Sequence, residues 1–532
     1  MGGQGDGAGL EVSRRRLLAA AGIGGVALAG VLGEAGPVDA ALAPADPATV
    51  PPVAGLHLQF GADAASQIVV SWHSLQPVRA PRVLLGRIDG KLEQTAAAAT
   101  VSYTDAKSGQ TVYAHHARID RLKPDTPYMY AALHEGAAPR FGGFRTAPRG
   151  RAAFTFTSFG DQGTPTLGRL FTLPPGVAPP EHLPNPIYVN DNLGSPSAAD
   201  TTLGVERLQP LFHLFNGDLS YANLAHDRVR AWWDFWENNS RSAAHRPWMP
   251  SPGNHENELG NGPIGYRAYQ TYFSLPETPG QTEATRGLWY AFTVGSVRVI
   301  SIANDDVAYQ DSGDTYVRGY SSGAQKDWLE VELAGARRDK HIDWIVVCMH
   351  QVAISTASAA NGADLGIREE WVPLFDQYGV DLVVCGHEHH YERSLAIRGH
   401  EDNPTLTPIP TALSTDVIDT TQGTVHMVIG GGGTSRPSNG ELFDPPRCRV
   451  ITAVGLPDPR TGRRPPVYVQ EAAPWSAVRN AAHSYGFAAF TVDPGLRRGD
   501  FTTIKVVYYD VVGPGGQLAP FETFTLRRPR RD

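Results

Sequence analysis

The chain has 532 residues, a formal net charge of −8 at pH 7, 41% apolar residues and 19% charged residues. This length exceeds one ordinary hydrophobic core, so we expect more than one domain in a soluble globular protein. The acidic balance gives no electrostatic footprint for nucleic acid, and we expect no nucleic-acid binding. The 57 glycines and 42 prolines favour many turns, and the three cysteines make no disulfide framework.

The first 43 residues have the composition of an export signal followed by the start of a linker. Three arginines, Arg14 to Arg16, precede a mild apolar stretch that ends near residue 33, and residues 38–40 offer a small-residue cleavage site. This arrangement resembles a twin-arginine signal peptide and predicts a periplasmic, cell-wall-associated or secreted protein. Because the apolar stretch is short and rich in glycine, we expect no stable membrane span after cleavage. An uncleaved anchor is the alternative.

Residues 51–147 have the pattern of a small β-sandwich. Trp72 ends an apolar run, and residues 122–128 resemble the tyrosine corner of fibronectin type III domains. No catalytic constellation occurs here, so we expect a packing or spacing domain. The expected strands are 56–60, 67–72, 82–88, 112–119, 128–133 and 141–145.

Residues 152–532 have a different pattern, in which apolar runs end in residues that bind metals. The carboxyl ends of adjacent strands meet at one edge of an open sheet, so these residues are expected to lie together. We therefore predict an α/β domain with two sheets and βαβ connections, which includes a strand-forming region at 423–525. The residues that follow the five apolar runs are Asp161, Asp218, Asn254, His350 and His387 with His389.

Several segments between these runs carry their own expectations. A helix is expected at 228–238, with Trp232, Trp233 and Trp236 in the core, and another at 324–334. The proline-rich insertion 164–210 is either a lid or a disordered loop. Strands are expected at 424–429, 486–492 and 503–512, with the glycine run 430–433 as a turn close to the site. The arginine-rich end, 526–532, is expected to be a solvated tail.

The candidate ligands form a set of hard oxygen and imidazole donors with no thiolate. Such a set suits first-row metals such as iron, zinc or manganese. Seven donors exceed one tetrahedral site, so one carboxylate is expected to bridge two ions. Two ions about 3.5–4 Å apart can clamp the oxygens of an in-line phosphoryl displacement and supply hydroxide at mild pH. The set is Asp161, Asp218, Tyr221, Asn254, His350, His387 and His389.

In their order, the five motifs resemble those of the calcineurin-like metallophosphoesterases, and the Gly217-Asp-x-x-Tyr221 motif resembles that of the purple acid phosphatases. The resemblance implies two metal ions, with iron at the Tyr221 site and zinc, manganese or iron at the other. It assigns Asp161, Tyr221 and His389 to the first ion and Asn254, His350 and His387 to the second, with Asp218 as the bridge.

The same resemblance gives His255 a catalytic role in holding phosphate and protonating the leaving oxygen. A histidine that only fixes a metal ligand is the alternative. Plant-type members carry further histidines where residues 351–386 here have none. In their place we expect Asn361 and Arg368 to donate to phosphate, and Asp364 to hold His255. The alternative is a solvated loop that leads into a helix at 368–377.

The expected activity is hydrolysis of small-molecule phosphate monoesters by a metal-bound hydroxide, in an exported enzyme similar to acid phosphatases. A phosphodiesterase or phospholipase-like activity at the same site is the alternative within this chemistry. A surface-binding module with a vestigial site is the alternative from another class, and the complete ligand set argues against it. The sequence carries no signal for the oligomeric state.

Overall fold

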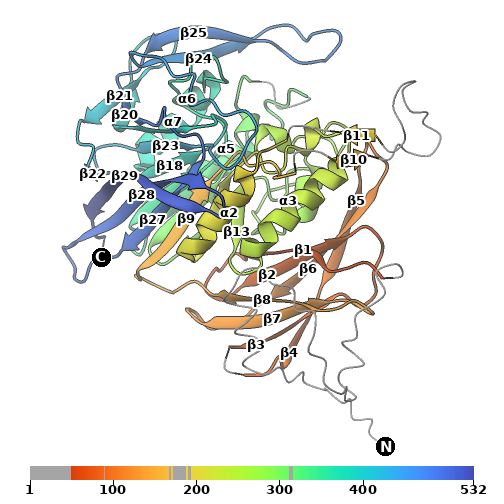
Figure 1. Ribbon diagram of the computed structural model, residues 1–532. Coiled ribbons are helices and arrows are strands. Elements are labelled where there is room, and N and C mark those ends of the chain that lie inside the picture. The colour runs from red at the N-terminus through yellow and green to blue at the C-terminus, as the bar shows by residue number, and fades with distance from the viewer. Residues whose placement is uncertain are drawn as a thin grey trace, which may run out of the picture.

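The computed structural model describes residues 50–88, 90–166, 169–171, 187–189, 193–310 and 315–531. The predicted export signal and much of the segment 164–192 lie outside these residues. A β-sandwich at the N-terminus is followed by a larger unit of two sheets with helices (Figure 1). In these parts of the chain, no helix combines the length and the apolarity needed to span a bilayer.

The N-terminal unit contains two four-stranded antiparallel sheets. Tyr128 accepts a hydrogen bond from the Lys123 backbone N–H at 2.9 Å, which confirms the predicted tyrosine corner. The sequence pattern missed β4 and β5, because their mostly exposed Ala and Thr residues lack an apolar alternation. One sheet has the order β1 (Ala54–Phe60), β2 (Ile68–Ser74), β6 (Thr111–Ile119), β5 (Ala99–Thr104), and the other β4 (Gln94–Ala97), β3 (Arg82–Arg87), β7 (Pro127–Leu133), β8 (Arg140–Arg145).

Two seven-stranded sheets form the larger unit, and parallel strands lie at one edge of the first sheet and at the centre of the second. These parallel strands are short and buried, as strands covered on both faces are. The first sheet has the order β13 (Trp248–Ser251), β12 (Phe212–Asn216), β9 (Phe154–Phe159), β27 (Gly486–Asp493), β28 (Phe501–Gly513), β29 (Gln517–Pro529), β22 (Val417–Asp419). The second has the order β14 (Tyr290–Val294), β15 (Val297–Ser301), β16 (Trp344–Cys348), β18 (Leu382–Cys385), β23 (Val425–Ile429), β19 (Tyr391–Ser394), β26 (Ser476–Arg479).

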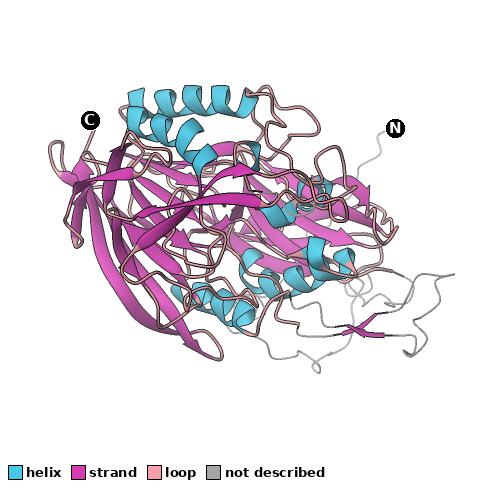
Figure 2. Ribbon diagram, turned by 90° about the horizontal axis from the view of Figure 1, so that it is seen from above, coloured by secondary structure: helices cyan, strands magenta, loops and turns pink. Residues whose placement is uncertain are grey.

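Helices cover the outer faces of the strands, as Figure 2 shows. On α3, Trp232 and Trp236 are buried and Trp233 is half-buried. Trp236 reaches the sandwich, where its ring stacks on that of His57 at 3.8 Å. The helices are α2 (Ser197–Leu208), α3 (Arg228–Ala243), α4 (Arg267–Tyr272), α5 (Ala324–Arg338), α6 (Leu365–Glu370) and α7 (Val372–Tyr378).

Smaller elements complete the larger unit. The short helices η2 (Ala222–Leu224), η3 (Asn254–Glu256) and η4 (Asn304–Asp306) follow strand ends. A three-stranded sheet has the order β17 (Ala363–Asp364), β24 (Arg447–Val454), β25 (Pro466–Ala472). The two-stranded pairs are β10 (Arg169–Phe171) with β11 (Ile187–Val189), and β20 (Ala396–His400) with β21 (Pro408–Ala412).

Three expectations about single segments were wrong. The segment 164–210 is not all loop, because α2 occupies its end and packs on α3. The end of the chain is not a solvated tail, because Leu526 is buried in β29 and Arg528 lies 2.5 Å from the Asp381 carboxylate. The single helix at 368–377 is two helices, since Pro373 lacks an N–H and begins a new one in the first turn of α7.

Candidate metal centre

All eight predicted site residues lie where the two large sheets meet, beyond the carboxyl ends of their parallel strands. Asp161 follows β9, Asp218 follows β12 and Asn254 follows β13 in the first sheet. His350 and His387 follow β16 and β18 in the second sheet. The structure therefore brings together side chains that lie as far apart in the sequence as Asp161 and His389.

The backbone at this edge is unusual, because four of these residues have a left-handed conformation. Their φ angles are 59° at Asp161, 53° at Asp218, 55° at Tyr221 and 71° at His387. Side chains other than glycine rarely adopt this conformation, and it concentrates at functional sites. Gly386 lets its backbone approach Asp161 closely, since a Cβ at this position would lie 2.2 Å from Asp161 Oδ2. The loops are shaped to turn side chains toward one place.

One cluster of donors consists of Asp161, Tyr221 and His389. The Tyr221 hydroxyl lies 3.3 Å from Asp161 Oδ1 and 3.2 Å from His389 Nε2. His389 Nε2 lies 3.3 Å from Asp161 Oδ1. His389 Nδ1 donates to the Arg436 carbonyl at 2.5 Å, so Nε2 carries a lone pair in the neutral ring.

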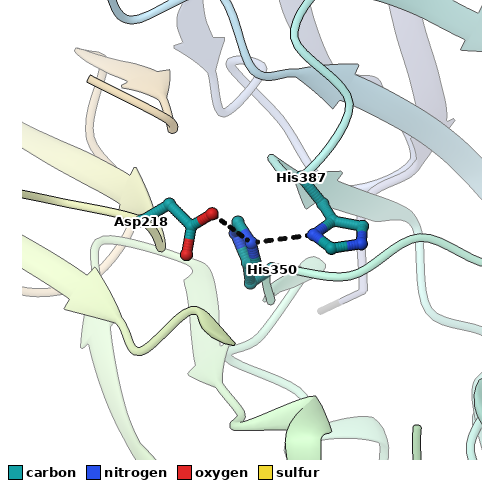
Figure 3. Close-up of side chains that lie close together, drawn as sticks. All are labelled: Asp218, His350 and His387. Carbon is teal, nitrogen blue, oxygen red and sulfur yellow. Dashed lines mark hydrogen bonds and ion pairs between the residues drawn. The ribbon is translucent and has the colours of Figure 1, made fainter. Parts of the chain in front are cut away.

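A second cluster surrounds His350 Nε2. It lies 3.0 Å from Asp218 Oδ2, 2.9 Å from Asn254 Oδ1 and 3.1 Å from His387 Nδ1. Figure 3 shows the Asp218 carboxylate and the His387 ring on opposite sides of His350. His350 Nδ1 donates to the Asn216 carbonyl at 2.8 Å. All of these side chains are buried.

This second cluster is suited to a cation. His387 Nε2 lies 2.5 Å from Gln310 Oε1, to which it donates, so His387 Nδ1 has a lone pair and faces the lone pair of His350. The atoms that meet here are all acceptors when both histidines are neutral: His350 Nε2, His387 Nδ1, Asp218 Oδ2 and Asn254 Oδ1. No proton is then available to form a hydrogen bond between them. Burial opposes a charge on His350, yet the Asp218 and Asp161 carboxylates raise its pKa to about 10. The oxygen and imidazole donors of both clusters fit first-row metal ions.

His255 lies beside both clusters. Its Nδ1 is 2.9 Å from Asn223 Oδ1, and its Nε2 is 3.9 Å from Asp218 Oδ2. Its ring centroid is 4.5 Å from that of Tyr221. Burial lowers the pKa of His255 to about 4. Asn223 is a site residue that the sequence analysis did not predict. It lies two residues after Tyr221, so the Gly217-Asp-x-x-Tyr221 motif could have indicated it.

The expectation that Asp364 holds His255 was wrong. The Asp364 carboxylate accepts the backbone N–H groups of Tyr309, Gln310 and Gly366 instead. It therefore fixes the segment that carries Gln310. Gln310 is a second site residue that the sequence did not reveal, because only the fold brings it to His387.

Asn361 and Arg368, which were expected to donate hydrogen bonds to phosphate, make contacts within the protein instead. Asn361 Nδ2 donates to the His387 carbonyl at 2.7 Å, so Asn361 supports a site residue from behind. Arg368 is buried, donating to the Ala353 and Thr405 carbonyls at 2.7 Å and to Glu471 at 2.9 Å. The expectation that Arg368 binds phosphate was wrong, since these contacts use its guanidinium within the core.

Glu256 also positions its neighbours. Its carboxylate accepts the backbone N–H groups of Asp218, Leu219 and Gly253 at 2.7–2.9 Å. The loop with Asp218 and the turn with Asn254 are thereby tied together. Burial and the Asp218 charge raise the pKa of Glu256 well above its usual range. The three hydrogen bonds offset part of the cost of burying this polar group.

Comparisons with known proteins agree with this arrangement. Residues 53–147 match the family model "Purple acid Phosphatase, N-terminal domain", and residues 189–391 match "Calcineurin-like phosphoesterase". An uncharacterized protein of Mycobacterium tuberculosis is 56% identical over 98% of this chain and 96% of its own length. A phosphoenolpyruvate phosphatase of Allium cepa is 29% identical, covering 71% of this chain and 69% of its own.

A solved structure supports the fold. The purple acid phosphatase isolated from yellow lupin (Lupinus luteus) seeds aligns with a TM-score of 0.62 at 19% identity, over 90% of this chain and 75% of that one. The fold class predicted from the sequence, a β-sandwich followed by an α/β metallophosphoesterase domain, is confirmed. The chain belongs to the purple acid phosphatase-like group of the calcineurin-like phosphoesterases and is a metal-dependent phosphatase.

Proposed function

We propose that this chain is an exported enzyme that hydrolyses small-molecule phosphate monoesters at a centre of two metal ions. The observation that carries the proposal is the grouping of seven oxygen and nitrogen donors into two adjacent clusters. Asp161, Tyr221 and His389 would hold one ion, and Asn254, His350 and His387 the other. Asp218 would bridge them, a role supported by its charge acting on both Asp161 and His350.

The donor chemistry supports iron beside Tyr221, because a tyrosinate is a hard anionic ligand. Zinc, manganese or iron would occupy the other position. When bound, the two ions supply the nucleophile and neutralise the phosphoryl oxygens. The contribution of the protein is to fix the donors. The Asn216 and Arg436 carbonyls orient His350 and His389, and Gln310 orients His387.

His255 would hydrogen-bond to the phosphate or to the leaving oxygen. Its Nδ1 is held by Asn223, so its Nε2 is the atom available to the site. An amide side chain can pair with either neutral tautomer of a histidine. His255 can therefore present an uncharged N–H or a lone pair, and this role does not require acidic pH.

Two substrates that differ only in esterification test the monoester proposal. We expect metal-replete protein to hydrolyse para-nitrophenyl phosphate with a kcat/KM at least about tenfold above that for bis(para-nitrophenyl) phosphate. Elemental analysis should find two metal ions per chain. Faster cleavage of the diester would assign the centre to diesters instead. A protein that binds no metal and cleaves neither compound would be a binding module with a vestigial site.

Export is supported by Arg14 and Arg15 and the apolar stretch that follows them. The twin-arginine route depends on the arginine pair. Replacing both arginines by lysine keeps the positive charge, so it tests the signal and not the charge. We expect phosphatase activity outside the cytoplasm of cells that express the full chain. Replacement of both arginines by lysine should retain the protein inside. Unchanged export of that variant would refute this route.

A further inference from the structure

A long β-hairpin, β24–β25, stands next to the metal centre. It joins the segment that supports the site, since β24 pairs with β17 and the Tyr468 hydroxyl donates to the Asn361 carbonyl at 3.0 Å. Asn361 in turn donates to the His387 carbonyl. Figure 1 shows the hairpin as a projection from the larger unit. It lies outside the residues matched by either family model.

The loop of this hairpin, residues 455–465, is held in one shape. The Gly455 N–H donates to the Pro465 carbonyl at 2.9 Å, and the Asp458 N–H donates to the Arg463 carbonyl at 2.8 Å. Prolines at 457, 459, 465 and 466 restrict the backbone further. A loop fixed in this way can present side chains with a small loss of conformational entropy on binding.

Between this loop and Gln310 lies a cavity of about 510 Å³. Arg463 and Arg464 line it, and Gln310, which forms part of its wall, contacts His387. The cavity is therefore next to the place where the reacting phosphate would sit.

Among the described residues that line this cavity, two arginines and one aspartate carry a charge. The aspartate, Asp458, accepts the backbone N–H groups of Arg460 and Thr461 at 2.7 and 3.2 Å. Arg464 is held in place by the Gly455 carbonyl at 3.4 Å and by the face of the Tyr316 ring at 5.1 Å. Guanidinium groups are well matched to phosphate and carboxylate oxygens.

We propose that Arg463 and Arg464 form a second anion-binding subsite, which selects phosphate esters that carry another anionic group away from the reacting phosphate. A sugar bisphosphate is such a substrate. This inference rests on the proposed function, because the metal centre must hold the first phosphate. Arg463 and Arg464 would then determine specificity, without taking part in the chemical step.

The test compares fructose 1,6-bisphosphate with fructose 6-phosphate, which differ by one phosphate. We expect the wild-type protein to prefer the bisphosphate in kcat/KM, mainly through KM. Arg463→Gln and Arg464→Gln should each lower the ratio of the two kcat/KM values by at least about fivefold, and salt should lower it too. Arg460→Gln is the matched control, because the Arg460 side chain is 89% exposed, close to Asp458 and outside the cavity lining.

Two results would overturn the subsite. One is an unchanged ratio in both cavity variants, and the other is an equal loss in the Arg460 control. Failure of the proposed function gives a different pattern, in which the wild-type protein hydrolyses neither sugar phosphate. Calorimetric titration of the wild-type protein with fructose 1,6-bisphosphate then decides the subsite separately. Binding that Arg463→Gln weakens supports it, and binding that is absent or unaffected overturns it.

Discussion

At the scale of single residues, Tyr221 makes the clearest prediction. Burial, with the Asp161 and Asp218 charges, raises the pKa of Tyr221 well above 10, so only a bound cation can make it a tyrosinate. We expect the iron-loaded protein to absorb visible light by charge transfer from tyrosinate to iron. Tyr221→Phe should remove the band, whereas Tyr309→Phe, whose hydroxyl contacts Glu369, should keep it. A colourless protein that contains iron would contradict the assignment.

Asp218 should matter more for the metals than for the fold. Its carboxylate faces His350 and also accepts the backbone N–H of His255 at 2.9 Å. Asp218→Asn removes the anion that would screen two cations, so we expect metal loss and a kcat at least about a hundredfold lower. Exposed Asp339→Asn is the control. Elemental analysis and kinetics give the answer, and an active variant with two ions per chain would exclude a bridging Asp218.

The pairing of His255 with Asn223 predicts a change in pH dependence. A carboxylate at position 223 would favour the charged imidazolium and raise the pKa of His255 by about 1 to 3 units. We expect Asn223→Asp to move the limb of the kcat/KM profile that reports the ionisation of His255 to higher pH, while Asn223→Ala should not. If both variants shift the profile equally, the effect comes from lost positioning and not from charge.

These residues also show what the sequence could and could not predict. Asp161, Asp218, His350 and His387 were predictable because each follows a buried apolar run, and parallel strands end at a common edge. Gln310 was not, because its contact with His387 depends on how Asp364 holds the chain. Such long-range backbone contacts leave no local pattern.

At the scale of elements, strand β29 is also held by a long-range contact that the local sequence pattern does not predict. Its arginines resemble a solvated tail in the sequence, but Arg528 closes a buried contact with Asp381 at the start of β18. Asp381 also binds Arg337 at 2.9 Å and the Ile345 N–H at 2.9 Å. A partner this far along the chain, from a strand of the other sheet, is invisible to periodicity.

This contact predicts that the C-terminal strand stabilises the fold. Arg528→Ala leaves the buried Asp381 carboxylate with one guanidinium fewer, and we expect a loss of about 2–3 kcal/mol in the free energy of unfolding. Arg498→Ala, an exposed arginine in the turn before β28, should change it by less than about 0.5 kcal/mol. Urea unfolding measures both. A solvated tail would make the two variants indistinguishable.

At the scale of the whole molecule, a layer of histidines, two buried and one half-buried, joins the sandwich to the phosphoesterase unit. The His57 Nε2 lies 2.9 Å from the Tyr272 carbonyl, and the His116 Nε2 lies 3.0 Å from the Thr271 carbonyl. The His73 ring packs edge-on against Trp233 and Tyr272 at 5.0 and 5.3 Å. Burial lowers the pKa of His57 and of His116 to about 4 and that of His73 to about 3.

The junction should therefore be sensitive to acid. The folded pKa values lie below the ordinary value of 6.5, so the unfolded chain binds more protons in the window from about pH 6.5 down to 4. The stability that these neutral histidines contribute is complete above pH 6.5. It is lost as the pH falls through this window, by up to about 1.4 kcal/mol per pH unit for each histidine. We thus expect a lower free energy of unfolding at pH 5 than at pH 7.5, measured by urea unfolding.

His73→Phe tests which groups cause this loss. It keeps an aromatic ring between Trp233 and Tyr272 and removes a ring whose two nitrogens have no hydrogen-bond partner in the described part of the chain. We expect the difference in unfolding free energy between pH 7.5 and pH 5 to shrink by about 1–2 kcal/mol. His400→Gln, at an exposed position of β20, should leave the difference unchanged. If both variants keep the wild-type difference, carboxylates elsewhere cause the acid sensitivity, and the histidine layer is only a packing surface between the two units.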